Sequence, residues 1–173
     1  KIKMSEIIID SPEEQKLRAE LQKRTDPDGL RIARFLKMPD LSRREGSPIA
    51  EIANRILASP YFQGLDVIKT PEIVPASVSF DLFDFPADHP ARSPSDTYYV
   101  DGGHILRTHT TIMWYYYLLD KGVKERIEAN EAVGCFSFGK VYRRDEIDRN
   151  HMNVFHQIDG WYLAPKSAKT IGV

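Results

Sequence analysis

Two stretches of sequence, VGCFSFGKVYRRDE (residues 133–146) and VFHQIDGWYLA (residues 154–164), decide the fold of this chain. Both are rich in the aromatic and β-branched residues that favour strands, and charged and polar residues separate them. The pattern therefore predicts two long strands joined by a polar loop. Successive side chains on a strand point to opposite faces, so Phe155, Gln157 and Asp159 would share one face.

This face gains charge if the two strands pair as a hairpin, because Arg143 and Asp145 then join it. An arginine offers phosphate a planar fork of donors, and a carboxylate two residues later can orient a nucleotide or pair with that arginine. The set fits a small polar ligand with a flat ring. It also fits an ordinary sheet face with a cross-strand salt bridge, which contributes little at a surface.

The histidines near this face do not indicate a metal centre. His151 and His156 are five positions apart, so they would point to opposite faces of one strand. Neither their spacing nor Cys135 supplies a recognisable set of zinc ligands. The sequence therefore predicts no metal ligands, and it offers no convincing nucleophile paired with a base.

The composition indicates a globular protein of ordinary domain size. The 173 residues are 42% hydrophobic, and the formal net charge of −1 gives no sign of a nucleic-acid partner, although a local basic patch stays possible. The single cysteine excludes an internal disulfide and suits a reducing compartment. No apolar run approaches the roughly 18 residues of a membrane span. We expect a cytoplasmic protein that does not enter the membrane.

The first part of the chain is predicted to be helical and peripheral. Ser11 and Pro12 begin one helix, and residues 25–46 read as a linker with one short helix near residues 30–36. The predicted domains are therefore an N-terminal helix and linker at 1–46 and a core at 47–173.

The core begins with a third helix, which starts at Ser47 and Pro48 and is followed by a short strand that Pro71 ends. The spacing of apolar residues in this helix predicts one buried face, made of Ile49, Ile52, Ala53, Ile56 and Leu57.

The middle of the chain mixes loops, strands and one helix. Residues 80–94 are proline-rich and loop-like, residues 97–100 and 104–110 read as strands around a glycine turn, and residues 110–121 read as a helix. Helices first and mostly strands later favour an α+β fold with an antiparallel β-sheet flanked by helices. In the proline-rich loop at 80–94, three polar residues are expected to hold the loop in place by hydrogen bonds: Asp88, His89 and Arg92.

Residues 139–160, GKVYRRDEIDRNHMNVFHQIDG, resemble motif 2 of class II aminoacyl-tRNA synthetases, in the form found in phenylalanyl-tRNA synthetase alpha subunits. FPADHPARSPSDTYYV (85–100) and LRTHTT (106–111) resemble two further stretches of that family, in the same order. Residues 47–73 resemble motif 1, which forms the class II subunit interface, and motif 2 extends over about 139–163. The resemblance spans roughly residues 47–163 and implies a class II synthetase-like sheet.

The resemblance assigns the ATP-binding roles to residues of the predicted hairpin. Arg143 would hold the α-phosphate and is the expected catalytic residue. Asp145 would help fix the nucleotide, His151 would contact the phosphates from the loop, and Phe155 would stack on adenine.

The amino-acid site is implied by the same likeness. Gln157 and Asp159 match positions that orient the amino acid and its ammonium group. His109 and Thr111, which would share one face of a strand, match positions lining that site, and Tyr99 matches an aromatic residue of the same pocket.

The implied function is ATP-dependent activation of phenylalanine to the adenylate and its transfer to tRNA(Phe). Adenylation proceeds mainly by positioning and charge stabilisation, so it requires no side-chain nucleophile. Mg²⁺ would accompany ATP, with ligands that are not in this chain. The implied partners are a beta subunit and a second alpha copy, in a heterotetramer.

Two departures from the family pattern leave alternatives open. Trp114 stands where bacterial relatives usually have glutamine, which bears on the choice of amino acid. A glycine-rich motif 3 is absent, so we expect a fragment whose sheet is incomplete on its C-terminal side and which is inactive alone. The alternatives are a non-catalytic synthetase-like module that binds a nucleotide or a partner, and a sibling class II synthetase with another amino acid.

Overall fold

The long hairpin predicted from the sequence is the centre of the molecule. In the computed structural model, which describes residues 6–166, its strands are β5 (Val133–Tyr142) and β6 (Val154–Leu163). They pair antiparallel over their full length, from Val133 opposite Leu163 to Tyr142 opposite Val154. All of β5 is buried, whereas β6 is half-buried at the edge of its sheet. The predicted hairpin is confirmed, but its first strand ends at Tyr142 instead of Glu146, so Arg143 and Asp145 follow the strand and do not lie on its face.

Two shorter strands complete this sheet and make it mixed. β1 (Glu6–Ile8) and β2 (Asp66–Lys69) extend it in the order β1-β2-β5-β6. β1 pairs parallel to β2 and β2 pairs parallel to β5, so the prediction of an antiparallel sheet is wrong for these pairs, although the α+β class is confirmed. The long connection between β2 and β5 explains the difference, because a crossover with helices can return the chain in the same direction.

A second, two-stranded sheet pairs β3 (Ile73–Pro75) antiparallel with β4 (His104–Leu106). The predicted strands at 97–100 and 104–110 are shorter than expected. The first contributes only a bridge from Tyr99 to Ile105, and the second ends at Leu106. The chain then bends so that the backbone of Arg107 bonds to Glu72 and Tyr142 instead of continuing the ladder.

The N-terminal helices belong to the hydrophobic core. α1 (Pro12–Leu21) is capped by Ser11 as predicted, and α2 (Pro27–Lys37) is longer than the expected short helix and is capped by Asp26. Ile32 and Phe35 of α2 are buried together with residues of the later strands. The description of residues 25–46 as a linker is therefore wrong. The domain boundary at residue 46 stays a prediction, and residues 1–5 and 167–173 of the two predicted domains lie outside the described residues.

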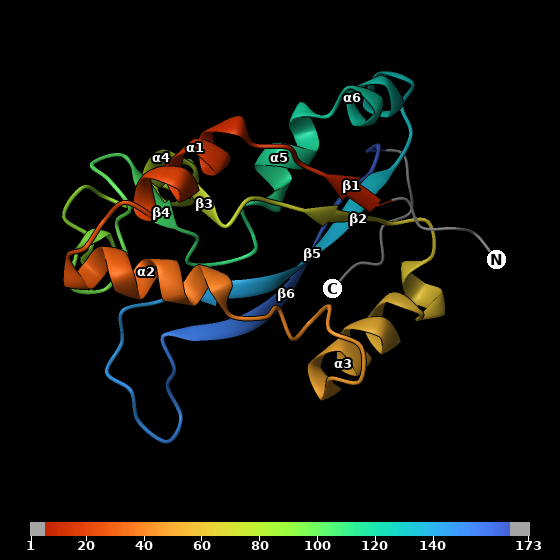
Figure 1. Cartoon of the computed structure of the whole chain (residues 1–173). Coiled ribbons are helices and arrows are strands. Elements are labelled where there is room, and N and C mark those ends of the chain that lie inside the picture. Colours follow the sequence, from red (N-terminus) through yellow and green to blue (C-terminus); the bar gives the residue numbers. More distant parts are fainter. Residues whose placement is uncertain (1–5, 167–173) are drawn as a thin grey trace.

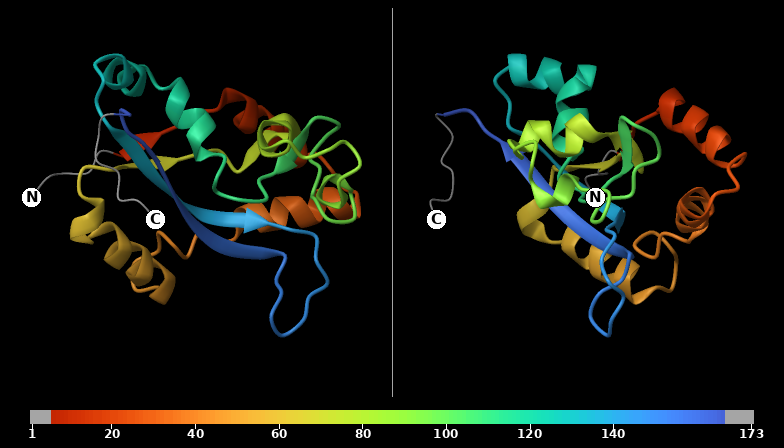
Figure 2. Two further views of the ribbon diagram at one scale, coloured as in Figure 1. Left: turned by 180° about the vertical axis from the view of Figure 1, so that it is seen from behind. Right: turned by 90° about the vertical axis from the view of Figure 1, so that its left-hand side faces the viewer.

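Helices cover both faces of the larger sheet (Figures 1 and 2). α5 (Met113–Leu119) and α6 (Lys121–Glu128) pack with Ile68 and Cys135 on one face. α3 (Pro48–Leu57) covers the opposite face. The predicted helix at 110–121 thus ends earlier, and a further helix follows it.

The capping residues explain two of these boundaries. Asp120 caps α6 by accepting a hydrogen bond from the Val123 amide, which ends α5 and starts α6. Ser47 caps α3 as predicted. On α3, Ala53 packs against Val67 and Phe138, but Ile52 is 59% exposed, so the predicted buried face is wrong at that position.

Short helical turns lie in the connection between the two strands of the smaller sheet, β3 and β4: α4 (Ala76–Ser79), η2 (Asp81–Phe83) and η3 (Pro90–Arg92). Another such turn, η1 (Pro60–Phe62), follows α3. Within residues 6–166, none of the helices has the length and apolar character needed to cross a bilayer.

Candidate active site

Arg143 and Phe155 meet at the open end of the β5–β6 hairpin. Arg143 is the first residue after β5, and its guanidinium carbon lies 5.1 Å from the centroid of the Phe155 ring. Its Nε donates to the carbonyl of Thr108 at 3.4 Å. The side chain is exposed, so its guanidinium remains accessible to a ligand. The sheet register accounts for the contact, because Phe155 pairs with Val141, two residues before Arg143.

The loop between β5 and β6 encloses a cavity of about 270 Å³ beside this pair. Asn153 closes the loop, since its Nδ2 donates to the carbonyl of Asp145 at 2.8 Å. His151 is exposed, and the hydrogen bond from its Nδ1 to Asp148 raises the pKa of the imidazole. The four residues predicted to bind ATP all line this cavity: Arg143, Asp145, His151 and Phe155.

A second cavity of about 390 Å³ adjoins the first, because Arg143 and Asp145 line both. His109 and Thr108, from the segment after β4, and Phe85, from the proline-rich loop, contribute to its lining. Together the two cavities form one polar and aromatic cleft at the end of the hairpin.

Gln157 and Asp159 continue along the β6 face that begins at Phe155, and both contact the segment after β4. The Gln157 Oε1 accepts a hydrogen bond from the Thr110 amide at 3.3 Å. The Asp159 Oδ2 accepts bonds from the hydroxyls of Thr110, at 2.5 Å, and Thr111, at 3.1 Å. The predicted amino-acid residues Gln157, Asp159 and Thr111 are thus brought together.

His109 and Thr111 lie on no common strand, because β4 ends at Leu106, before either residue. The expectation that the two share one strand face is wrong. The His109 ring packs edge-on against Phe83, 4.7 Å between centroids, and its Nε2 lies 3.3 Å from the carbonyl of Ser79. Burial lowers the pKa of this imidazole, and its Nδ1 is buried without a hydrogen-bond partner among the described residues. The ring is therefore neutral near pH 7 and lines the second cavity.

Tyr99 is not among the residues that line either cavity. Its hydroxyl donates to the carbonyl of Arg92 at 2.7 Å, and its ring packs with the cluster around Ile105. The role predicted for it in amino-acid binding stays a prediction. Arg92 and His89 hold the proline-rich loop: Arg92 bonds to Asp81 and to a backbone carbonyl, and His89 Nδ1 accepts from the Ala91 amide.

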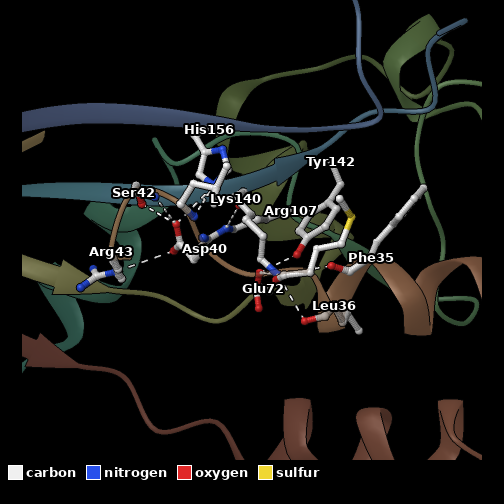
Figure 3. A network of polar contacts seen from close by, with 12 residues as sticks. Phe35, Leu36, Asp40, Ser42, Arg43, Glu72, Arg107, Lys140, Tyr142 and His156 are labelled. Atoms are coloured by element: carbon white, nitrogen blue, oxygen red, sulfur yellow. Dashed lines mark hydrogen bonds and ion pairs between the residues drawn. The ribbon is translucent and has the colours of Figure 1, made fainter. Parts of the chain in front are cut away.

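Beneath the cleft lies a buried polar network that sequence reasoning missed (Figure 3). Lys140 and Arg107 are each 3% exposed. The Lys140 ammonium lies 3.2 Å from the Glu72 carboxylate, which also accepts a hydrogen bond from the Tyr142 hydroxyl at 2.5 Å. One signal was present, since Lys140 is the only charged residue in the otherwise apolar and small-residue run of β5.

The described residues offer neither a metal centre nor a reactive thiol. Across positions 6–166, no group of three His, Cys, Asp or Glu side chains could hold a metal ion. Cys135 is buried, and burial together with Asp66 raises the pKa of its thiol to about 12. A thiol with this pKa is not a nucleophile at neutral pH.

Known proteins are similar to this chain in sequence and fold. The family described as "tRNA synthetases class II core domain (F)" matches residues 35–168. The alpha subunit of phenylalanine–tRNA ligase from Neisseria meningitidis is 35% identical over 147 residues, which cover 84% of this chain and 41% of that protein. The corresponding Coxiella burnetii subunit is 34% identical over 120 residues, covering 69% and 34%. The mitochondrial phenylalanine–tRNA ligase of Saccharomyces cerevisiae is 41% identical over 102 residues, covering 58% and 21%.

A solved structure shows the fold. The crystal structure of pyrrolysyl-tRNA synthetase from Desulfitobacterium hafniense has a TM-score of 0.51, with 19% identity over 83% of this chain and 45% of that one. The chain spans less than half the length of each of these relatives. With the family match extending over most of its length, the chain belongs to the family described as tRNA synthetases class II core domain (F).

Proposed function

We propose that this chain forms the motif 1 and motif 2 part of the activation site in a phenylalanine–tRNA ligase alpha subunit. The complete enzyme would activate phenylalanine with ATP and transfer it to tRNA(Phe). One observation carries the proposal: a single face of β6 runs from Phe155, stacked under Arg143, to Gln157 and Asp159, which contact the turn after β4. Such a face can hold a nucleotide at one end and an amino acid at the other.

The nucleotide would occupy the cavity at the open end of the hairpin. Phe155 offers a ring face for adenine, and Arg143 offers the α-phosphate a guanidinium that is exposed and held by one long hydrogen bond within residues 6–166. Asp145 and His151 line the same cavity. His151, with its raised pKa, would carry positive charge more readily toward the phosphates.

The amino acid would lie further along β6. The Asp159 carboxylate would attract its ammonium group, and the Gln157 amide would orient it. Thr111 holds the carboxylate in place through its hydroxyl. His109 and Tyr99 would belong to the wall of this pocket, His109 as a neutral ring because burial lowers its pKa.

In this arrangement the phenylalanine carboxylate attacks the α-phosphorus of ATP, and pyrophosphate leaves. Arg143 would stabilise the charge that develops on the α-phosphate oxygens, an effect that typically amounts to about 10²–10³ in rate. Holding both substrates on one strand face removes much of the entropic barrier to their reaction. The described residues would act by binding and orienting, without a covalent intermediate on the protein.

Class II synthetases use ATP, and Mg²⁺ would enter with it. The described residues do not supply a set of three metal-binding side chains. We therefore propose that the ion is held by the phosphates and by groups outside this chain, and no step above depends on it.

The partners would be tRNA(Phe), a beta subunit and a second alpha copy, assembled in the cytoplasm. Exposed apolar side chains on and after α3 support the second copy: Ile52 is 59% and Tyr61 is 89% exposed. An Ile52→Asp substitution should weaken association of alpha subunits in sedimentation, whereas Lys124→Asp on α6 should not. Unchanged association of the Ile52 variant would remove α3 from the interface.

The decisive experiment is exchange of labelled pyrophosphate into ATP by the assembled enzyme, with and without phenylalanine. We expect exchange that requires phenylalanine and falls at least about 100-fold in Arg143→Ala. Arg144→Ala is the matched control: this neighbouring arginine turns away to pair with Asp28 and to lie over the Tyr98 ring. It should keep exchange within a fewfold of the unsubstituted enzyme.

Exchange that survives Arg143→Ala unchanged would contradict the proposed site. Exchange that requires another amino acid would instead indicate a sibling synthetase. That second candidate rests on Trp114, whose ring centroid lies 6.0 Å from that of Phe83, the residue on which the His109 ring packs. Thermal stabilisation of the assembled enzyme by phenylalanine, compared with tyrosine and leucine, separates the two.

A further inference from the structure

Arg107 is a buried arginine that belongs to none of the predicted substrate contacts. Its guanidinium donates from Nε to the carbonyl of Lys140 at 2.8 Å, and from Nη1 to the carbonyl and hydroxyl of Thr70 at 3.0 and 2.9 Å. Its partners are therefore fixed parts of the protein, and the side chain joins the end of β2 to β5.

The backbone of Arg107 makes two further links between the same segments. Its amide donates to the carbonyl of Glu72 at 2.9 Å, and its own carbonyl accepts from the amide of Tyr142 at 3.0 Å. Tyr142 is the last residue of β5 and directly precedes Arg143. β4 and β5 belong to different sheets, so these bonds replace the ladder that would otherwise hold the two strands in register.

The residues that follow Arg107 build the wall of the cleft. The Thr108 carbonyl accepts from Arg143, the Thr110 amide donates to Gln157, and the Thr110 hydroxyl donates to Asp159. A shift of Arg107 would therefore move this wall relative to β5 and β6. The distances between the groups assigned to the α-phosphate and to the amino acid would change together.

The fit around Arg107 is tight on the β5 side. A Cβ atom placed on Gly139 would lie 2.5 Å from the Arg107 Nη2, closer than any real contact allows. The glycine therefore leaves the space that the guanidinium fills. Buried charge is balanced nearby: burial alone would raise the pKa of the Glu72 carboxyl, but Arg107 and Lys140 outweigh it, and the pKa is lowered.

We infer that Arg107 is a positioning residue for the activation reaction, which sets the Thr108–Thr111 wall against the end of β5. The inference rests on the proposed function. Because Arg107 acts through the geometry of other groups, its loss should lower kcat for exchange more than it raises KM for ATP or phenylalanine. A displacement of about 1 Å in a positioned group can reduce a rate about 100-fold.

The test compares three variants of the assembled enzyme in phenylalanine-dependent pyrophosphate exchange. Arg107→Met removes the donors, and Arg107→Lys keeps the charge without the planar fork. Gly139→Ala keeps the arginine but forces its guanidinium or the backbone to shift, since Gly139 has a φ of +154° and its Cβ would lie 2.5 Å from Nη2. We expect kcat to fall at least about tenfold in all three, with KM changed less than about threefold. Hydrogen exchange at the amides of residues 108–111 and 142–143 should become faster in each variant.

Arg126→Met is the matched control, because Arg126 bonds to Asp66 near the start of β2, the other end of the same sheet, and partly buries its guanidinium. It should leave kcat within about threefold. An equal loss of kcat in Arg126→Met, or full kcat in a folded Arg107→Lys or Gly139→Ala, would overturn the positioning role. Should Arg107→Met fail to fold, those two variants decide. Absence of phenylalanine-dependent exchange in the unsubstituted enzyme would overturn the proposed function itself, and the positioning role with it.

Discussion

Arg107 and Arg143 show two opposite uses of the same side chain within one small region. Arg107 is 3% exposed and donates to backbone and hydroxyl oxygens at 2.8–3.0 Å. Arg143 is exposed and, within residues 6–166, its guanidinium makes one hydrogen bond of 3.4 Å. A buried charge must find its partners in the protein, whereas a charge that serves a ligand must keep donors available. The number and length of hydrogen bonds therefore separate the scaffold from the site.

The two sides of the hairpin repeat this contrast. Lys140, on one side, donates to the carbonyls of Phe35, Leu36 and Met38 at the end of α2 and pairs with Glu72. Gln157 and Asp159 lie on the other side. Within residues 6–166, the hydrogen bonds of their side chains all go to the turn after β4. The first side should respond to substitution mainly through stability, and the second mainly through substrate binding.

The largest effect is expected from Lys140→Met, measured by urea unfolding. Lys140→Met removes one of the cations around the buried Glu72 carboxylate, which keeps Arg18 and the Tyr142 hydroxyl as partners, so the free energy of unfolding should fall by about 3 kcal/mol. The end of α2 loses its donor as well. Lys124→Met, at an exposed lysine of α6, should change stability by less than about 0.5 kcal/mol. A loss of unfolding free energy below about 1 kcal/mol for Lys140→Met would contradict the claim that this side of the hairpin mainly determines stability.

A smaller effect, on binding, is expected from Asp159→Asn. The variant keeps the shape but loses the charge offered to the ammonium group, which is worth about 1.5–3 kcal/mol for a charged hydrogen bond. KM for phenylalanine in pyrophosphate exchange should therefore rise about 10- to 100-fold, with the unfolding midpoint nearly unchanged. Asp101→Asn, at an exposed turn, serves as the control. If KM rises for ATP and not for phenylalanine, Asp159 belongs to the nucleotide end instead.

The smallest effect is expected from pH acting on His156. Its Nε2 accepts a hydrogen bond from the Leu41 amide at 2.9 Å, and burial lowers its pKa. Asp40, Lys140, Arg107 and Glu72 are the charged groups that act on it. Below about pH 6.5 the unfolded chain binds more protons than the folded one, so this contribution to stability is complete above that pH and declines in acid, by at most about 1.4 kcal/mol per pH unit.

His156→Gln should make the decline of stability between about pH 6.5 and 5 less steep than in the unsubstituted chain, as followed by urea unfolding at several pH values. His109 contributes in the same direction, and His104 and His151, whose pKa values are raised, in the opposite one. The comparison of the two proteins isolates His156. An identical dependence of stability on pH in both proteins would show that folding does not change the pKa of the His156 imidazole.

Alternation along the chain was enough to predict the part of the fold that builds the cleft. Side chains alternate between the two faces of a strand, and this period of two along β5 and β6 predicted the hairpin. The shared face of Phe155, Gln157 and Asp159 follows directly from it. Caps and prolines likewise predicted where α1 and α3 begin. These are local signals, and local geometry decides them.

The failures concern interactions between distant segments. The parallel pairing of β2 with β5 and the end of β4 at Leu106 depend on partners far along the chain. Lys140 and Arg107 find carbonyls 102 and 33 residues away, which no local pattern specifies. Of the site, the ATP-binding set was grouped by motif resemblance, whereas the arrangement of His109 and Thr111 required the bend after β4.

Because Lys140 donates to the carbonyls at the end of α2, this helix gains its last hydrogen bonds only after β5 has been synthesised. The helix leaves the ribosome long before its donor, since Met38 and Lys140 are separated by 102 residues. At about 5–20 residues per second, α2 waits roughly 5–20 seconds for Lys140 and for Tyr142, which completes the cluster around Ile32 and Phe35. During this interval its apolar face has no lasting cover from β5. We therefore expect the nascent N-terminal helices to be a binding site for chaperones, and the completion of β5 to be the event that releases them.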